Sequence, residues 1–134
     1  MNTLAWTDDI VGRLPYSGAN FALAKAFFYA AWCVWAAERQ APCPADLSGS
    51  CKYGSLFMRS VFGGALRGHY QHQFNLIDGQ LVDLSHDAQD VARMALPHRH
   101  EPEYFDVPEL QASLLGCQPR AEAWAQAFID AQST

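Results

Sequence analysis

A cysteine near the middle of the chain has the surroundings of a nucleophile. Cys51 begins the stretch "CKYGSLFMRSVFGG", in which apolar residues recur at helical spacing. The first turn of a helix presents unpaired N–H groups and a partial positive charge, and both stabilise a thiolate. Cys51 is therefore a candidate catalytic residue, although a single cysteine at such a place is more often a packing residue.

A histidine and an aspartate lie on either side of a predicted hairpin turn about 20 residues later. Asp78-Gly79 is a strong signal for a two-residue turn, and it separates two β-compatible runs. This turn places His72 and Asp83 on one face of the hairpin as diagonal neighbours, within reach of a hydrogen bond. Cys51, His72 and Asp83 together predict a triad in which the imidazole activates the thiol and the carboxylate orients the imidazole.

Two other histidines compete with His72 for the role of base. His69 and His86 fall on the face opposite Asp83 in this register, and either would replace His72 if the turn contained a bulge. Asn75 also lies on the opposite face, where we expect it to support the hairpin. The choice of His72 therefore depends on the register of the turn.

The remaining cysteines and histidines give weaker signals. No two cysteines form a CxxC pair and the N-terminal segment lacks the pattern of a signal peptide, so we expect a cytoplasmic protein with four free thiols. Cys33 lies within an apolar helical stretch, where we expect it to be a core residue. His98 and His100 lie in a predicted loop, solvated or paired with nearby acids. They are the only zinc candidates, and without a matching cysteine pair we expect no metal and no cofactor.

The helices and the hairpin expected around these residues indicate an α+β fold, in which a helix bundle packs on a small antiparallel sheet. The sheet is expected as a hairpin over about residues 70–85, and the first helix as apolar nearly all round and covered on most faces. We expect one domain over residues 1–134. Helical spacing marks segments 17–40, 51–62, 88–96 and 109–132, the last with a break at 116–119.

Composition excludes several classes of function. Half of the 134 residues are hydrophobic, 17% are charged, and the net charge is −5, so the basic face that nucleic acids require is lacking. The longest apolar stretch, residues 21–37, carries Lys25 and is short for a membrane span, which favours a buried helix. We expect no nucleic-acid or membrane partner. An acidic, tryptophan-rich chain with exposed apolar surface also makes a homodimer an expected assembly.

An ordered set of short motifs resembles the small bacterial proteins called YunG-like. That family pattern has an Ala-Trp in a first helix, Gly-Gln-Cys opening a second helix that ends in Phe-Gly-Gly, and then His-x-x-Asn, a turn and Asp-Leu-Thr. The matching residues, which span about residues 28–92, are Ala31-Trp32, Gly49-Ser50-Cys51, Phe62-Gly63-Gly64, His72, Asn75, Gly79, Asp83, Leu84 and Ser85.

This resemblance implies a papain-like fold of the NlpC/transglutaminase type, whose members are amidases, peptidases, deamidases and acyltransferases. It also implies an amide or protein substrate for Cys51. The chain departs from the pattern at Ser50, where the family has Gln. If that Gln donates to an oxyanion, this chain lacks the donor, and Ser50 is expected to cap the helix instead. The alternative function is a non-catalytic papain-like scaffold that binds or regulates a partner.

Overall fold

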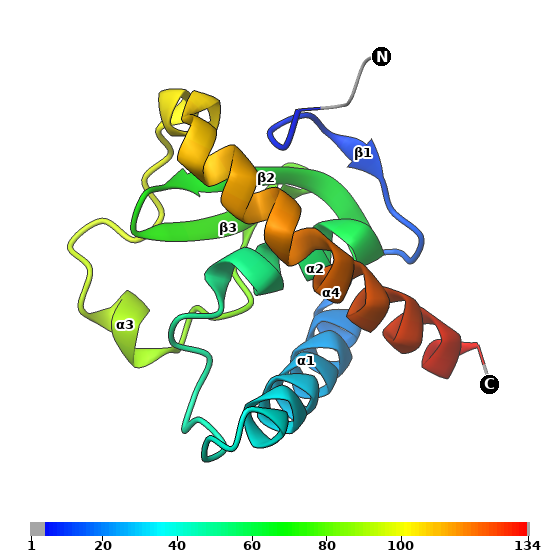
Figure 1. Ribbon diagram of the computed structural model, residues 1–134. Coiled ribbons are helices and arrows are strands. Elements are labelled where there is room, and N and C mark those ends of the chain that lie inside the picture. The colour runs from blue at the N-terminus through cyan, green and yellow to red at the C-terminus, as the bar shows by residue number, and fades with distance from the viewer. Residues whose placement is uncertain (1–4, 134) are drawn as a thin grey trace.

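Four strands form one antiparallel sheet in the computed structural model, which describes residues 5–133. The strand order follows the chain, β1-β2-β3-β4, so each strand pairs with the next one along the sequence (Figure 1). The strands are β1 (Ile10–Val11), β2 (Gly63–His69), β3 (His72–Ile77) and β4 (Gln80–Val82).

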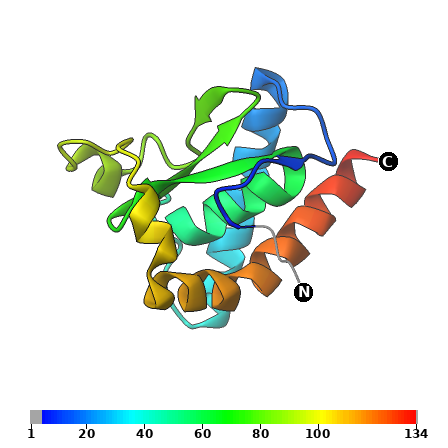
Figure 2. The same cartoon turned by 90° about the horizontal axis from the view of Figure 1, so that it is seen from above.

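Helices cover one side of this sheet, and the α+β class predicted from the sequence is confirmed. Helix α2 packs against β3 and against the C-terminal helix α4, and Figure 2 shows α2 between the strands and α4. No helix in residues 5–133 has the length and apolarity needed to cross a membrane. The helices are α1 (Gly18–Glu38), α2 (Cys51–Phe62), α3 (Gln89–Ala92), the 3₁₀ helix η1 (Pro102–Asp106) and α4 (Pro108–Gln132).

The predicted turn and its register are confirmed. Ile77 pairs with Gln80 and Leu76 with Leu81, so the turn contains two residues. Asp78 and Gly79 both have positive φ, 53° and 75°, as a type I′ turn requires. Because the turn contains no bulge, the side-chain alternation from which the site was predicted is preserved.

The prediction missed a strand directly before the hairpin. Gly63 ends α2, as predicted, but it is also the first residue of β2, which pairs with β1 at its first two residues and with β3 over the remaining five. A Cβ atom on Gly64 would lie 2.2 Å from the carbonyl oxygen of Leu76, so a glycine is required there for β2 and β3 to approach. The expected two-stranded hairpin is therefore the central part of a larger sheet.

The helices also differ from the prediction. Helix α1 buries only a single stripe along its length, and Leu23 and Val34 on its other faces are exposed. The predicted helix 88–96 is reduced to α3, and η1 lies within the expected loop. The predicted break at 116–119 is wrong, because α4 continues through Pro119. Its buried residues keep a spacing of three or four across the proline, and they are Leu110, Leu114, Cys117, Ala121, Ala125 and Phe128.

The expectation of four free thiols is wrong, because Cys33 and Cys43 form a disulfide. Their separation of ten residues matches no CxxC pattern, and the pairing follows from the way the chain folds back after α1. Cys33 is thus a cross-linked residue and not a core thiol. Cys51 and Cys117 are free, and Cys117 is buried in α4, as expected of a structural residue.

The loop between the disulfide and α2 is also tied to α3. Asp46 accepts a hydrogen bond from the backbone N–H of Gln89 at 2.8 Å, and Asp90 accepts one from the backbone N–H of Gly49, also at 2.8 Å. Ser48 accepts a third from the backbone N–H of Asp90 at 3.1 Å. These contacts and the disulfide fix the loop that directly precedes Cys51.

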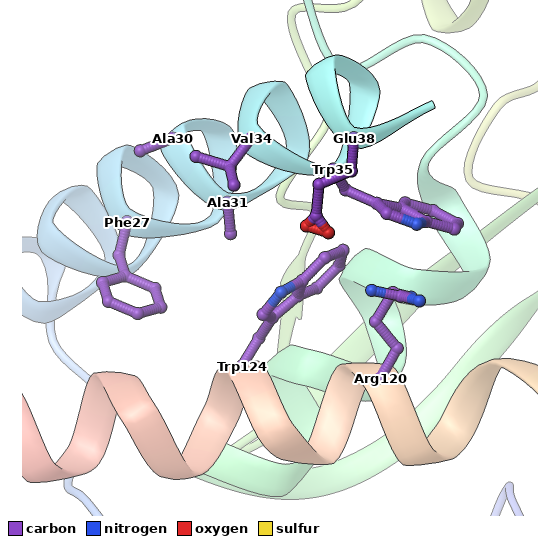
Figure 3. A pocket seen from close by; sticks show the side chains of 8 residues that line it. All are labelled: Phe27, Ala30, Ala31, Val34, Trp35, Glu38, Arg120 and Trp124. Carbon is purple, nitrogen blue, oxygen red and sulfur yellow. The ribbon is translucent and has the colours of Figure 1, made fainter. Parts of the chain in front are cut away.

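The aromatic residues of α1 are mainly core residues, as predicted. Phe28 and Trp32 are buried, while Phe27 and Trp35 are partly buried and face α4. Between α1 and α4 lies a hollow of about 310 Å³, lined by Trp35, Trp124, Arg120 and neighbouring α1 residues (Figure 3). None of the predicted catalytic residues lines this hollow.

Candidate functional site

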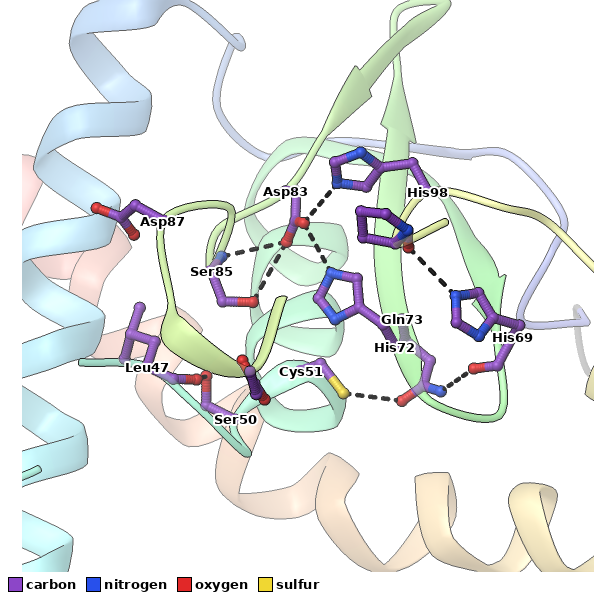
Figure 4. A network of polar contacts seen from close by, with 12 residues as sticks. Leu47, Ser50, Cys51, His69, His72, Gln73, Asp83, Ser85, Asp87 and His98 are labelled. Atoms are coloured by element: carbon purple, nitrogen blue, oxygen red, sulfur yellow. Dashed lines mark hydrogen bonds and ion pairs between the residues drawn. The ribbon is translucent and has the colours of Figure 1, made fainter. Parts of the chain in front are cut away.

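Cys51 is the first residue of α2 and its thiol lies beside the sheet. The side chain is half-buried, and its Sγ donates a hydrogen bond to Oε1 of Gln73 at 3.1 Å (Figure 4). Gln73 in turn donates from Nε2 to the backbone carbonyl of His69 at 2.7 Å. The thiol therefore sits at the helix start, as predicted, and it contacts a buried amide that the sequence prediction did not include.

His72 and Asp83 form the predicted hydrogen bond. Nε2 of His72, the first residue of β3, lies 2.7 Å from Oδ2 of Asp83, which follows β4. Both residues are buried, with exposed fractions of 0% and 5%. A hydrogen bond between charged groups at this depth is screened little by solvent, so the carboxylate holds the imidazole firmly.

Asp83 is the centre of the polar network. Its Oδ2 is contacted by both His72, at 2.7 Å, and His98, at 2.8 Å. Its Oδ1 accepts from the backbone N–H and the hydroxyl of Ser85, at 3.2 and 3.3 Å. Burial raises the pKa of Asp83, but the hydrogen bonds and charges of His72 and His98 outweigh that effect and hold the pKa below its ordinary value. Asp83 is therefore an ionised acceptor, and both histidines donate to it.

The electrostatic surroundings of His72 favour its protonated form. Burial by itself lowers the pKa of His72, whereas the hydrogen bond to Asp83 and the charges of Asp83 and Cys51 raise it, with the net result that the pKa of His72 is about 9. Nε2 is engaged with Asp83, which leaves Nδ1 for Cys51. Nδ1 makes no hydrogen bond, because the thiol is directed at Gln73.

The other histidines do not take the place of His72. The ring of His69 is engaged with the backbone of Pro97 and Gln71, and His86 is exposed beside Phe21. Neither is among the described partners of Asp83. Of the three histidines compared in the sequence, His72, His69 and His86, only His72 contacts Asp83.

The two predicted supporting residues differ in outcome. Asn75 donates from Nδ2 to the backbone carbonyl of Ser55 at 2.9 Å and so ties β3 to α2, consistent with a supporting role. Ser50 does not cap α2 through its side chain, so that prediction is wrong. Its buried hydroxyl donates instead to the backbone carbonyl of Leu47 at 2.6 Å, within the preceding loop.

The network has two further members, His98 and Gln73. The sequence predicts His98 in a loop, solvated or paired with a nearby acid; its partner is Asp83, 15 residues earlier in the chain. Side chains alternate along a strand, so the prediction of His72 on the functional face turns its neighbour Gln73 to the other face, whereas Gln73 contacts the thiol of Cys51. Only the motif "HRH" gave any signal for His98, and no pattern in the sequence indicated Gln73.

Three of these side chains also form a group that could offer ligands to a metal ion. One ligand atom each from His72, Asp83 and His98 lies within 4.8 Å of the other two. The separations of 2.7 and 2.8 Å are those of hydrogen bonds. Two ligands of a tetrahedral zinc ion would lie about 3.3 Å apart, as follows from bonds of about 2.0 Å. The geometry therefore fits a hydrogen-bond network better than a metal centre.

The arrangement offers a thiol at a helix N-terminus, an imidazole beside it and a buried carboxylate behind the imidazole. Those are the parts that nucleophilic acyl chemistry requires. Comparisons with protein families, curated proteins and solved structures found no match to this chain.

Proposed function

We propose that the protein is a cysteine-dependent hydrolase or acyltransferase that acts on an amide or thioester through Cys51, His72 and Asp83. The observation that carries the proposal is the buried His72–Asp83 hydrogen bond of 2.7 Å, with Cys51 on the other side of the imidazole at the start of α2. The resemblance to YunG-like and papain-like proteins supports the same proposal, because those three residues match the ordered motifs.

Starting from the neutral thiol and imidazole, the reaction would begin with transfer of the Cys51 proton to Nδ1 of His72, and the raised pKa of His72 favours the resulting thiolate–imidazolium pair. The thiolate then attacks the carbonyl carbon of the substrate, forming a C–S bond, and His72 returns the proton to the leaving amine or thiol as the bond to it breaks. Water, activated by the same imidazole, or an acceptor amine releases the acyl group and restores the thiol. Asp83 stabilises the imidazolium throughout and keeps its charge.

The developing oxyanion needs a hydrogen-bond donor close to Sγ. The backbone N–H of Cys51 is suited to this role, since the first N–H groups of a helix have no partner within the helix. The Ser50 hydroxyl is committed to Leu47, and one of the two Gln73 amide N–H groups to His69. If the Gln of the family pattern at position 50 donates to the oxyanion, this chain lacks that donor, and the backbone N–H of Cys51 would have to supply the hydrogen bond.

One observation favours a second candidate function, a non-catalytic scaffold that binds or regulates a partner. The thiol of Cys51 donates to Gln73 and not to His72, whose Nδ1 is left without a hydrogen bond. In a site that has lost its catalytic activity, the cysteine would be expected to make such a structural contact. In an active site, by contrast, the thiol must turn from Gln73 to Nδ1 before it reacts.

A cytoplasmic location remains a prediction from the sequence. The Cys33–Cys43 disulfide weighs against it, because structural disulfides persist mainly in oxidising compartments. Trapping free thiols in intact cells before lysis would decide the question. Two labelled cysteines per chain would indicate an oxidising compartment, and four would indicate the cytoplasm.

Alkylation by iodoacetamide at pH 6.5, mapped by mass spectrometry, tests the proposed function. An ordinary cysteine is mostly protonated and slow at this pH, whereas a thiolate paired with an imidazolium reacts fast. We expect selective labelling of Cys51, reduced at least tenfold in His72→Ala. Equally slow labelling of Cys51 with and without His72 would favour the scaffold.

A further inference from the structure

We propose that His98 is a positioning residue of the triad, which holds the Asp83 carboxylate in the orientation that His72 requires. The inference rests on the proposed function and adds a fourth residue to it. Its basis is that His98 and His72 share one oxygen of Asp83, at 2.8 and 2.7 Å (Figure 4).

His98 is placed to fix Asp83 from the side of the loop that follows α3. The two Ser85 contacts hold only Oδ1, so without His98 the other oxygen would retain a single donor, His72. The His98 side chain is one-third exposed, while those of Asp83 and His72 are almost fully buried. Its loss would therefore open Oδ2 to water on the exposed side and allow the carboxylate to turn away from His72.

The orientation of the His98 ring is itself constrained. Its ring meets the ring of Phe74 edge-on, with centroids 5.1 Å apart, and the neighbouring Pro97 carbonyl contacts Nε2 of His69 at 3.3 Å. A side chain so held loses little further freedom when it donates to Asp83, which favours the contact. The ring is thus preorganised for one acceptor.

A second histidine on the same loop provides a matched control. Nδ1 of His100 accepts a hydrogen bond from the backbone N–H of Gly68 at 3.0 Å, so His100 ties the loop to β2 without contacting Asp83. Removing His100 would loosen the loop, whereas removing His98 would both loosen the loop and withdraw a donor from the carboxylate. Comparing the two variants therefore distinguishes an effect on the orientation of the Asp83 carboxylate from an effect of a loosened loop.

The experiment compares His98→Ala, His98→Gln and His100→Ala with the unmodified protein in two measurements. The first is the rate of Cys51 alkylation by iodoacetamide at pH 6.5. The second is the ¹H–¹⁵N signal of the His72 ring, in which an Nε2–H donated to a carboxylate gives a strongly deshielded proton. Glutamine at position 98 can supply an N–H at nearly the place of the imidazole Nε2–H and should restore the contact.

We expect His98→Ala to slow the alkylation about tenfold, the effect of losing one hydrogen bond to a charged group, and to shift or broaden the His72 signal. His98→Gln should stay within about threefold of the unmodified protein, and His100→Ala within about twofold. An unchanged His72 signal and rate in His98→Ala, or an equal loss in His100→Ala, would overturn the inference.

The two proposals fail in different ways. If Cys51 of the unmodified protein reacts no faster than in His72→Ala, the proposed function fails. The His72 signal would still show whether His98 orients the Asp83–His72 pair. If Cys51 depends on His72 but neither measurement responds to His98, only the role of His98 is refuted.

Discussion

The hairpin side and the helix side of the site hold their functional groups in different ways. On the hairpin side, Asp83 accepts four hydrogen bonds and fixes His72 within the sheet. On the helix side, Cys51 makes one side-chain hydrogen bond, to Gln73, and Ser50 turns back to the loop before it. The orientation of His72 and Asp83 is therefore fixed by hydrogen bonds, whereas the thiol of Cys51 can bond either Gln73 or Nδ1 of His72.

Because of this difference, we expect the hairpin side to contribute mainly to the stability of the fold and the helix side mainly to the reactivity of the thiol. A buried carboxylate that accepts four hydrogen bonds is costly to disturb, and it contributes to stability as well as to orientation. A half-buried thiol with one weak hydrogen bond can rotate at little cost. Changes on the hairpin side should thus appear first in the free energy of unfolding, and changes on the helix side first in the chemistry of Cys51.

The largest loss of stability is expected from removing the centre of the hairpin network. Asp83→Ala withdraws the buried partner of His72 and His98 and should lower the free energy of unfolding by about 3–5 kcal/mol. Asp87→Ala is the matched control, because Asp87 pairs with Lys25 at 2.7 Å but is exposed, and it should cost less than about 1 kcal/mol. Urea denaturation of both variants checks the contrast, and equal losses would contradict it.

A pH dependence of stability is expected from His72. Its pKa is raised to about 9 in the folded protein from an ordinary 6.5, so its stabilising contribution is complete below pH 6.5 and is lost as the pH rises through 9. The size is about 3–4 kcal/mol at most, from about 1.4 kcal/mol per pH unit. Urea denaturation from pH 6 to 9.5 should show this decline, and His72→Gln should flatten it. If the free energy of unfolding of His72→Gln depended on pH as strongly as that of the unmodified protein, His72 would not be the source of the pH dependence.

The stability of the helix side should depend on the Cys33–Cys43 disulfide, which anchors the loop before α2. Replacing Cys33 and Cys43 with serine should lower the free energy of unfolding by about 2.5 kcal/mol, the value for a closed loop of this size. Dithiothreitol should cause a similar loss in the unmodified protein and none in the double variant. A thiol titration of the unfolded, unreduced chain should find two free cysteines; four would contradict the pairing.

The smallest effect is expected at Ser50. Ser50→Ala removes one buried hydrogen bond, to the Leu47 carbonyl, and should cost about 1 kcal/mol. Because the hydroxyl points away from Cys51, the alkylation rate should change less than twofold, whereas Gln73→Leu should change it more, since Gln73 holds the thiol. A large rate change in Ser50→Ala would show that Ser50 acts on the thiol after all.

The parts of the fold that follow local rules could be predicted. A two-residue Asp-Gly turn fixes the strand register, and the register in turn brought His72 to Asp83. The start of α2 at Cys51 followed from the helical spacing of its apolar residues. Each of these depends on neighbouring residues alone, which is why the candidate triad was accessible from the sequence.

The parts that depend on distant contacts were missed. Strand β2 contains three glycines and no β-branched residue, so its strand character comes from pairing with β3. Helix α4 passes through Pro119 because its buried stripe continues on both sides, although a proline inside a helix costs about 3 kcal/mol. The disulfide and His98 likewise depend on how loops return to the core, which no local pattern encodes.

The most direct test of the account is whether Cys51 forms an acyl intermediate. The protein would be incubated with an activated ester and an acyl thioester, quenched in acid and analysed by intact and peptide mass spectrometry. We predict a transient acyl adduct on Cys51 that decays with release of acid, that is absent in Cys51→Ser and at least tenfold slower to form in His72→Ala. Failure of the folded protein to acylate Cys51 with either reagent, or acylation that does not depend on His72, would contradict the account and leave the scaffold as the better description.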